Sequence, residues 1–394
     1  IHTTESIIMS IADGSQHRLT YGFESTYGVT PSSPTLKPFR HTGTSLGLEK
    51  SEIRSQELSA GRQFEFVRHG NKSVGNDVNF ELAYGAQDDF IEAALCGTWS
   101  TKVTSGAITA DAADGTFTRV SGSFVSDGFT AGKVATSSGY VGSGLNGRFV
   151  ITAVTALVLS VAPIEGQTMT TESGGGDELF VIEATVDNGV SRRFATFERY
   201  FADQGTYVYM TGLNASSLSL SISPDSVVSG SVSFIGKDLE PATASAKSGA
   251  TYPAATTTEP YDSFTGSIRD NGALTAVIQS IDFNCDNSMD RRFVIFDDTS
   301  LLPGIRKFNL SGTVSAFFDD ITLYNKFISE TSSNLQFELI DNDGNAYWVY
   351  MPNIKYMSGN PDVSDDGSVT ISMAFAGVKD TATGKTLIIQ RNPV

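Results

Sequence analysis

Hydrophobic and polar residues alternate over short segments along most of the chain, a pattern typical of strands with one buried face. In DVNFELAYG, residues 77–85, the apolar positions Val78, Phe80 and Leu82 share one side. FATFERYF and TYVYMTGL, joined by the turn ADQG, predict a β hairpin. Similar segments later in the chain are SFTGSI, TAVIQSIDFNC, KFNLSGTVSAF, LQFELID, AYWVYMPNI, SVTISMAFAGV and TLIIQR. The pattern therefore predicts a mainly β protein.

Two short helices interrupt this pattern at related places. DDFIEAALC begins with Asp88-Asp89, DDITLYNKFIS begins with Asp319-Asp320, and each follows a predicted strand. An aspartate at the start of a helix accepts hydrogen bonds from free backbone N–H groups and complements the helix dipole. We therefore predict Asp88 and Asp319 as the helix N-caps.

The sequence also contains an internal repeat. Residues 207–236 align without gaps on residues 348–377, an offset of 141, and ten of the thirty positions are identical. The two helices align at an offset of 231, which leaves 90 extra residues between Cys96 and Tyr207. One fold present twice, with an insert in the first copy, accounts for both offsets.

The composition of the chain changes at the edges of this insert. A stretch rich in Ser, Thr and Gly, with the short predicted strands FVITAV, ALVLSVA and QTMTTE, fills residues 100–176. We expect an inserted small all-β domain there, with the first copy at 1–99 and 177–240. Residues 241–260, rich in Ala, Thr and Pro, are expected to be a linker, followed by the second copy at 261–394.

The net charge and the cysteine content limit the functions that the protein could have. The 394 residues carry a formal net charge of −17, so a basic surface that grips nucleic acid is excluded as the main function. Cys96 and Cys285 are the only cysteines, which suits an intracellular protein with two buried thiols. The first residues lack the pattern of a signal peptide, and no run of 18 apolar residues occurs, so we expect no leader and no membrane span.

The order of elements resembles the major tail tube proteins of long-tailed, siphovirus-type bacteriophages. The segments that carry the resemblance are ELAYGAQDDFIEAALCGTW, LQFELIDNDGNAYWVYMPNIKYM and the final GVKDTATGKTLIIQR. SGSFVSDGFT and NGRFVITAV are similar to small β domains that some members carry as inserts. The resemblance covers most of the chain and is weakest at residues 30–60 and 240–260. It implies two tandem tube folds, each a β sandwich or half-barrel with one short helix, plus the inserted domain.

The resemblance also implies a function and a set of partners. In this family, subunits form rings whose inner sheets join into one barrel, and the rings stack into a tube that carries genomic DNA without binding it specifically. A chain with two copies of the fold would build the ring from three subunits as a pseudo-hexamer. The implied partners are further copies of the chain and the tail terminator, tape measure and distal tail proteins. The implied location is the virion tail, assembled in the host cytoplasm, with no membrane and no cofactor.

Two groups of residues are candidates for these contacts. The proline-containing segment 29–59 reads as a long irregular loop, and loops of this length are commonly functional. By resemblance it is the candidate ring-to-ring loop, with Pro31, Pro34, Lys37, Arg40, Glu49, Lys50 and Arg54 as candidate contact residues. An acidic lumen repels DNA phosphates, and Glu65, Asp77 and Glu81 are candidate lumen carboxylates.

Motifs for other chemistry do not fit their expected contexts. GTSLG (43–47) matches a nucleophile elbow but lacks the strand before it and the helix after it. GVKDTATGKT (377–386) has the wrong spacing for a phosphate-binding loop, and DNDGN (341–345) lacks the glutamate and the helices of a calcium site. Neither an enzyme nor a metal protein is expected. The main alternative is a tandem β-domain adhesin or virion decoration protein that binds through the insert, and a β-rich hydrolase is a third class.

Overall fold

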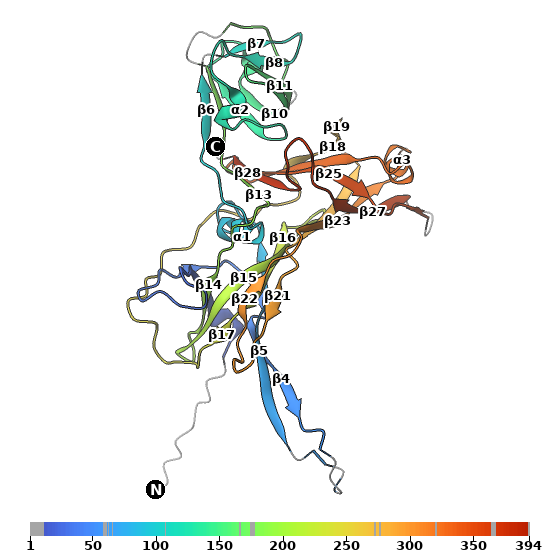
Figure 1. Ribbon diagram of the computed structural model, residues 1–394. Helices are drawn as coiled ribbons and strands as arrows, with labels where there is room; N and C mark the ends of the chain where they lie inside the picture. Colours follow the sequence, from blue (N-terminus) through green and yellow to red (C-terminus); the bar gives the residue numbers. More distant parts are fainter. Residues whose placement is uncertain are drawn as a thin grey trace, which may run out of the picture.

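The structure, a computed structural model, confirms the mainly β prediction. It describes residues 12–57, 61, 63–64, 66–106, 108–164, 167–173, 178–271, 273–275, 277–319, 321–363 and 368–392. This described part contains 28 strands, three α-helices and two short 3-10 helices, Gly14–Gln16 and Ser143–Leu145. Most strands belong to one large sheet system, and seven form a separate lobe (Figure 1). No helix in the described ranges has the length and apolar character needed to cross a membrane.

The first half of the large sheet system is built around one long strand. The predicted hairpin is confirmed, because β14 (Ala195–Phe201) pairs with β15 (Thr206–Ile222). β1 (His17–Phe23) pairs with the other edge of β14. The second part of β15 pairs with β16 (Ser229–Gly236), which in turn pairs with β5 (Val67–Glu81). β15 therefore belongs to two layers, with β14 on one and β16 on the other.

The second half follows the same pairing pattern. β24 (Ser333–Ile340) pairs with β25 (Ala346–Tyr356), and β18 (Gly266–Asp270) pairs with the other edge of β24. The end of β25 pairs with β27 (Thr370–Gly377), which pairs with β23 (Asn309–Phe317). Strands β18, β24, β25, β27 and β23 thus connect as β1, β14, β15, β16 and β5 do.

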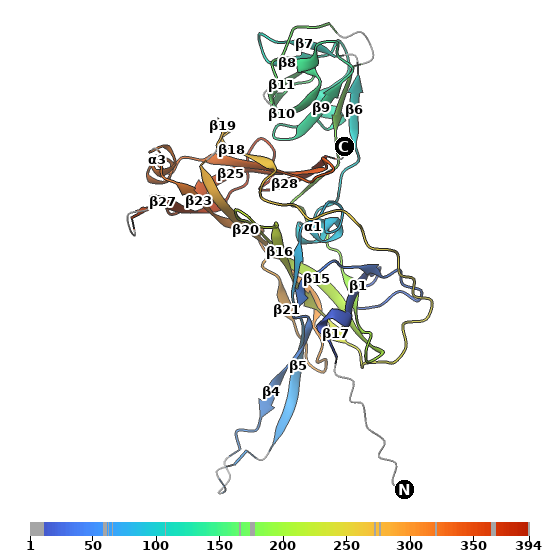
Figure 2. The same ribbon diagram turned by 180° about the vertical axis from the view of Figure 1, so that it is seen from behind.

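One strand joins the two halves. β20 (Ile278–Asp286) pairs with β23 of its own half and with β15 of the first half. The order β5, β16, β15, β20, β23 and β27 is therefore a continuous antiparallel sheet, which can be followed in Figure 2. A single hydrophobic cluster includes residues of both halves, among them Phe197, Phe234, Phe283 and Phe375. The two halves therefore share one core.

Short strands complete this system. β2 pairs with β1, and β13 pairs with β28, so a strand that follows the insert is bonded to the last strand of the chain. The short strands are β2 (Lys37–Pro38), β3 (Gly43–Thr44), β4 (Gly47–Arg54), β13 (Thr185–Asp187), β17 (Asp238–Leu239), β19 (Ala273–Leu274), β21 (Asp290–Arg292), β22 (Leu301–Gly304), β26 (Pro361–Asp362) and β28 (Ile388–Asn392).

Residues between α1 and β13 form the separate lobe, at the top of Figure 1. Its own core gathers phenylalanines such as Phe117, Phe149 and Phe180. The predicted strands FVITAV and ALVLSVA are present, but QTMTTE is not a strand, because this polar stretch meets the sheet through a single bridge of Glu172. The elements of the lobe are β6 (Val103–Gly106), β7 (Thr109–Asp111), β8 (Thr116–Thr118), α2 (Phe124–Asp127), β9 (Val134–Ser138), β10 (Gly147–Val154), β11 (Val158–Pro163) and β12 (Leu179–Ile182).

Both helices predicted at the Asp pairs exist, but neither Asp88 nor Asp319 is an N-cap. Gln87 precedes α1 (Asp88–Ala94), so Asp88 lies in the first turn with its side chain turned to tertiary partners. Ile321 precedes α3 (Thr322–Ile328), and Asp319 is exposed in the segment before it. The helix starts are therefore 234 residues apart instead of 231, because the second Asp pair lies before its helix rather than within it.

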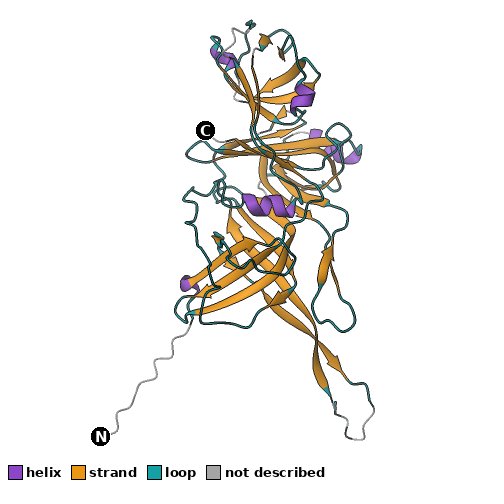
Figure 3. Ribbon diagram, turned by 60° about the vertical axis from the view of Figure 1, so that its left-hand side comes forward, coloured by secondary structure: helices purple, strands orange, loops and turns teal. Residues whose placement is uncertain are grey.

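The predicted irregular loop at 29–59 has two parts. Residues up to about 42 lie against the first half, with the buried Leu36 and Phe39 as anchors. The prediction of a loop is wrong for residues 47–54. They form β4, which pairs with residues 67–75 of β5. These two strands form a hairpin arm that projects from the body of the molecule (Figure 3).

Candidate functional site

The six-stranded sheet has one apolar and one polar face. In β15, Leu218 and Leu220 are buried in the core, while Ser217, Ser219 and Ser221 alternate with them. The same alternation continues in the neighbouring strands, because directly opposite residues of paired strands share a face. The residues of the polar face include Asp77, Asn79, Glu81, Ser229, Ser231, Ser233, Ser217, Ser219, Ser221, Asp282, Asn284, Asp286, Ser311, Thr313, Ser315, Thr370, Ser372 and Ala374.

The charge on this polar face is of one sign. Its ionisable residues are Asp77, Glu81, Asp282 and Asp286, and the segments through which the six strands pair with one another contain no lysine or arginine. Asp77 and Glu81 were candidate lumen carboxylates, and the structure brings both to this face. Glu65, the third candidate, lies outside the described residues.

Serine and threonine hydroxyls make up most of the rest of the face, and two hydrogen bonds link such hydroxyls to neighbours across the strands. The hydroxyls of Ser219 and Ser231 lie 2.8 Å apart across β15 and β16, and Ser233 donates to the Asp77 carboxylate at 2.5 Å. A shallow depression of about 600 Å³ extends over the six strands, lined by residues such as Asn79 and Asp282. The face therefore offers small neutral groups and carboxylates, and no cation that would hold a phosphate.

The sequence contained a signal for the second pair of carboxylates. In SIDFNCD the acidic and amide residues Asp282, Asn284 and Asp286 alternate with Ile281, Phe283 and Cys285. That alternation assigns the two sets to opposite faces. The alternation does not say which set shares a surface with Asp77. The pairing of β20 with β15 decides this, and it joins residues about 65 positions apart in the sequence.

The hairpin arm of β4 and β5 is the second candidate surface. Its outer part exposes Ile53, Phe64, Phe66 and Val67, and the Phe64 side chain is 59% exposed. A shorter hairpin of β21 and β22 lies beside it, held by Arg291, whose guanidinium donates to a β5 carbonyl at 2.9 Å. The turn of this hairpin exposes Val294, Ile295 and Phe296. Two apolar tips are thus present on β-hairpins of the two halves.

The candidate ring-to-ring residues divide between the body and the arm. Pro34 is buried, Lys37 Nζ lies 2.7 Å from Asp89 Oδ2, and Arg40 donates to the Thr258 carbonyl at 2.7 Å. Like the partly buried Pro31, these residues belong to the body of the molecule. Glu49, Lys50 and Arg54 are exposed on β4, in the strand that leads into the arm.

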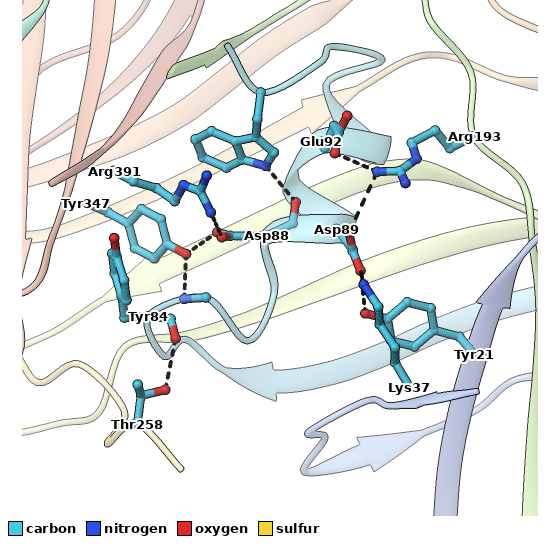
Figure 4. A network of polar contacts seen from close by, with 12 residues as sticks. Tyr21, Lys37, Tyr84, Asp88, Asp89, Glu92, Arg193, Thr258, Tyr347 and Arg391 are labelled. Atoms are coloured by element: carbon cyan, nitrogen blue, oxygen red, sulfur yellow. Dashed lines mark hydrogen bonds and ion pairs between the residues drawn. The ribbon is translucent and has the colours of Figure 1, made fainter. Parts of the chain in front are cut away.

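A polar network joins helix α1 to both halves (Figure 4). Asp88 accepts hydrogen bonds from Tyr347 and from Arg391, the latter at 2.5 Å. Burial raises the pKa of Asp88, and the bonds from Tyr347 and Arg391 oppose that rise. Asp89 turns the other way and accepts from Tyr21 at 2.9 Å. The Asp pair therefore holds the helix between two sheets, a tertiary role that helix capping rules do not reveal.

The three motifs GTSLG, GVKDTATGKT and DNDGN lie in turns and strands. GTSLG overlaps β3 and the start of β4, with no helix after it. Asp341 accepts from the Asn345 amide at 2.8 Å within a turn, and Asp380 accepts from the Thr383 amide at 2.7 Å in another. Among the described residues, no group of three or more His, Cys, Asp or Glu side chains could hold a metal ion.

Comparisons with known proteins identify a family. The sequence matches the phage tail tube protein family over residues 14–377. A search of the curated proteins found no match. Among solved structures, a chain of the phage phi92 endosialidase is similar at 9% sequence identity with a TM-score of 0.16. That match covers 90% of this chain and 57% of the endosialidase chain, so this chain spans little more than half of that protein.

Proposed function

The chain belongs to the phage tail tube protein family, and we therefore propose that it is the major subunit of a tail tube whose lumen conducts DNA. The family makes the chain a structural component of a phage tail. The finer role rests on one observation, the polar face of the six-stranded sheet, which carries hydroxyls and carboxylates and has no lysine or arginine in the segments that its six strands pair with one another.

This face has the chemistry that a DNA conduit requires. Phosphate contacts with lysine and arginine dominate the affinity of proteins for DNA, so a wall without them does not retain the moving chain. Carboxylates such as Asp77 and Asp282 repel phosphates, and the repulsion extends over a Debye length of about 8 Å at physiological salt. Serine and threonine hydroxyls on the same face carry no charge, so they add no electrostatic attraction for the phosphates.

A ring of three subunits would supply the wall of the tube. We infer that residues 1–99 and 177–240 form one tube fold, 261–394 a second, and 100–176 an insert on the outside. Three chains then contribute six similar sheets, and closure into a ring pairs every sheet edge. The siphovirus type, the trimer and the further partners (tail terminator, tape measure and distal tail proteins) belong to this proposal.

The hairpin arms are the proposed contacts between rings. The arm of β4 and β5 projects from the body and exposes apolar side chains at its outer part, of which Phe64 and Phe66 are the largest. Large exposed apolar groups on a projecting hairpin indicate a surface that another protein covers. The candidate residues Glu49 and Lys50 would then lie at the base of this contact and Arg54 in its outer part, opposite Val67, whereas Pro34, Lys37 and Arg40 stabilise the subunit itself.

Electron microscopy of the purified protein, with mass photometry on the same sample, tests the proposal. We expect rings with the mass of three subunits, or tubes made of such rings. Rings of six subunits would preserve the tube role and overturn the trimer. Monomers at every protein and salt concentration would overturn the tube role and favour the adhesin alternative.

A further inference from the structure

We propose that neighbouring subunits join by antiparallel pairing of residues 44–49 of one copy with residues 358–363 of the next, with Leu48 opposite Gly359. The partner is thus a second copy of this chain. The inference rests on the proposed tube function and adds to it the two segments and the register of the joint. Its basis is the joint between β15 and β20, which the structure shows within one chain.

The internal joint continues both faces of the sheet. β15 and β20 pair in unbroken register from Ser217 opposite Asp286 to Ile222 opposite Ile281. Within it, Leu218 lies opposite Cys285 and both side chains are buried in the core. The Ser217 and Asp286 side chains belong to the polar face. A joint of this kind therefore extends the apolar core and the polar wall together.

The ladders of the two halves show which residues are equivalent. In the first half, Val232 of β16 lies opposite Val78 of β5, and in the second half Met373 of β27 lies opposite Val314 of β23. The sequence offset of 141 aligns Val232 with Met373. Val78 and Val314 are therefore equivalent positions in the two halves.

The next strand along identifies the equivalent of β20. Thr44 lies opposite Val78, and Ile281 lies opposite Val314, so Thr44 corresponds to Ile281. Further along the same strands, Leu48 and Cys285 are equivalent by the same comparison of ladders. Residues 44–49 thus correspond to 281–286, the side of the internal joint that β20 supplies.

The offset of 141 identifies the other side of the joint. It aligns residues 217–222 of β15 with residues 358–363. The ladders agree, because Leu220 lies opposite Gly230 of β16, and Pro361 lies opposite Ile371 of β27. Applying the register of the internal joint to these equivalents places Ser358 opposite Glu49.

Both segments form sheet edges in the subunit. Among the described residues, 44–49 pair only with β5 and 358–363 only with β27. The Leu46 carbonyl accepts a side-chain bond from Arg199 at 2.7 Å, and a carbonyl oxygen has a second lone pair for a strand. Pro361 has no N–H to donate, and an edge strand is where a sheet tolerates a proline. Unpaired edges of this kind are templates for another chain.

Burial along the two edges alternates as it does in the internal joint. Leu46 is buried and Glu49 is exposed, while Gly359 is buried between the exposed Ser358 and Asn360. In the proposed register the buried Gly359 faces the half-buried Leu48, the buried Leu46 faces the half-buried Pro361, and the exposed Ser358 faces the exposed Glu49. A slip of one residue would reverse the faces of one strand.

Disulfide cross-linking of assembled tubes tests the register. The variant with Ser358→Cys and Glu49→Cys places two thiols on directly opposite residues. Their Cβ atoms lie about 4.5–5.5 Å apart in an antiparallel pair, and a disulfide needs about 3.5–4.5 Å, so a small shift of the two edge strands lets the bond form. The matched control, Asn360→Cys with Glu49→Cys, represents a slip of two residues on the same face. The native thiols of Cys96 and Cys285 are buried.

We expect mild oxidation to convert the Ser358→Cys, Glu49→Cys tubes into covalent species that end at three chains on a denaturing gel, with at least tenfold less product from the control. Equal or greater product from the control, or no product from either variant in tubes that are intact by electron microscopy, would overturn the register and preserve the tube function. A wild-type protein that forms neither rings nor tubes would overturn both.

Discussion

The Tyr347 hydroxyl donates a hydrogen bond to the Asp88 carboxylate across 259 residues of sequence. Tyr347 lies on β25 of the second half and Asp88 opens helix α1 of the first half. The Tyr347 oxygen also accepts from the Gly85 amide at 3.0 Å, and Arg391 of β28 donates to the same carboxylate (Figure 4). This buried contact therefore holds the helix, the turn before it and the second half in one arrangement.

Removing the Asp88 carboxylate is expected to destabilise the subunit. Asp88→Ala leaves the Tyr347 hydroxyl and the Arg391 guanidinium without their partner, at a cost of about 1–3 kcal/mol in the free energy of unfolding. Burial raises the pKa of Asp88, so the neutral form of this side chain is more favoured in the folded protein than it is in water. Asp88→Asn should therefore cost less than Asp88→Ala. Urea unfolding measures both, with Asp114→Asn on the exposed surface as control, and equal losses in the two Asp88 variants would contradict the argument.

Glu198 is expected to be the more costly carboxylate to remove. It is fully buried and accepts from Arg18 at 3.0 Å, from Tyr209 at 2.7 Å and from Tyr252 at 2.8 Å. Glu198→Ala leaves these donors unpaired, and we expect a loss of about 3 kcal/mol in the free energy of unfolding. Tyr252→Phe removes one bond and should cost about 1 kcal/mol.

Limited proteolysis separates this effect from general destabilisation. Tyr252 lies in the segment 241–260, and its bond to Glu198 holds this segment against the first half. A protease should therefore cut the Glu198→Ala and Tyr252→Phe variants faster within residues 241–260. If Glu198→Ala lost stability while cleavage in this segment stayed at the wild-type rate, the role of Glu198 in holding the segment would be refuted.

His17 should make the subunit less stable in mild acid. Burial, Arg199 and His41 together lower the pKa of His17 to about 4, below its ordinary value of about 6.5. Between these two pH values the unfolded chain binds a proton that the folded chain does not, so stability falls as the pH drops from 6.5 towards 4. Comparison of urea unfolding at pH 7.5 and pH 5.0 should show a smaller drop for His17→Asn than for the wild type. Identical drops would assign the acid sensitivity to other groups.

Gln390 should govern how tightly the lobe of β6–β12 is attached. Its side-chain amide accepts from the Val134 N–H at 2.9 Å and donates to the Val134 carbonyl at 2.5 Å, as a strand would. Gln390→Leu leaves both backbone groups buried without partners, which should cost about 2 kcal/mol. We expect hydrogen exchange at Val134 to accelerate at least tenfold. Gln390→Glu keeps an acceptor for the N–H and should accelerate it less, and unchanged exchange in Gln390→Leu would show that other contacts hold the lobe.

Lysines on the polar face should convert the tube wall into a DNA-binding surface. Ser219→Lys with Asp282→Lys adds cations to the wall, and tubes of this variant should retain short duplex DNA at low salt and release it as salt rises. The measurement is the amount of DNA protected from nuclease inside assembled tubes. Val120→Lys, on the fully exposed surface of the lobe, is the control, because DNA bound outside remains open to the nuclease. Equal protection in the two variants would show that the polar face is not the lumen.

The sequence alone determined the class of the fold and much of its local structure. Alternating polar and apolar residues specified the hairpin of β14 and β15, because a strand with one buried face requires a period of two. The same alternation assigned Asp77 and Glu81 to the side opposite Val78 and Phe80. The ten identities between 207–236 and 348–377 also indicated two related halves before any pairing was known.

Only the tertiary structure decided which surfaces these local features create. The pairing of β20 with β15 brings Asp282 onto one face with Asp77, and hydrogen bonds between distant strands leave no trace in local periodicity. Likewise, Asp88 was predicted as a cap from its position, but its partners Tyr347 and Arg391 come from the far end of the chain. The strand at residues 47–54 could not be predicted from the sequence pattern. Most of it lies in the projecting hairpin arm and buries no apolar face, so its residues do not alternate between apolar and polar. Local pattern fixes which side of a strand is apolar, whereas long-range pairing decides which strands share that side.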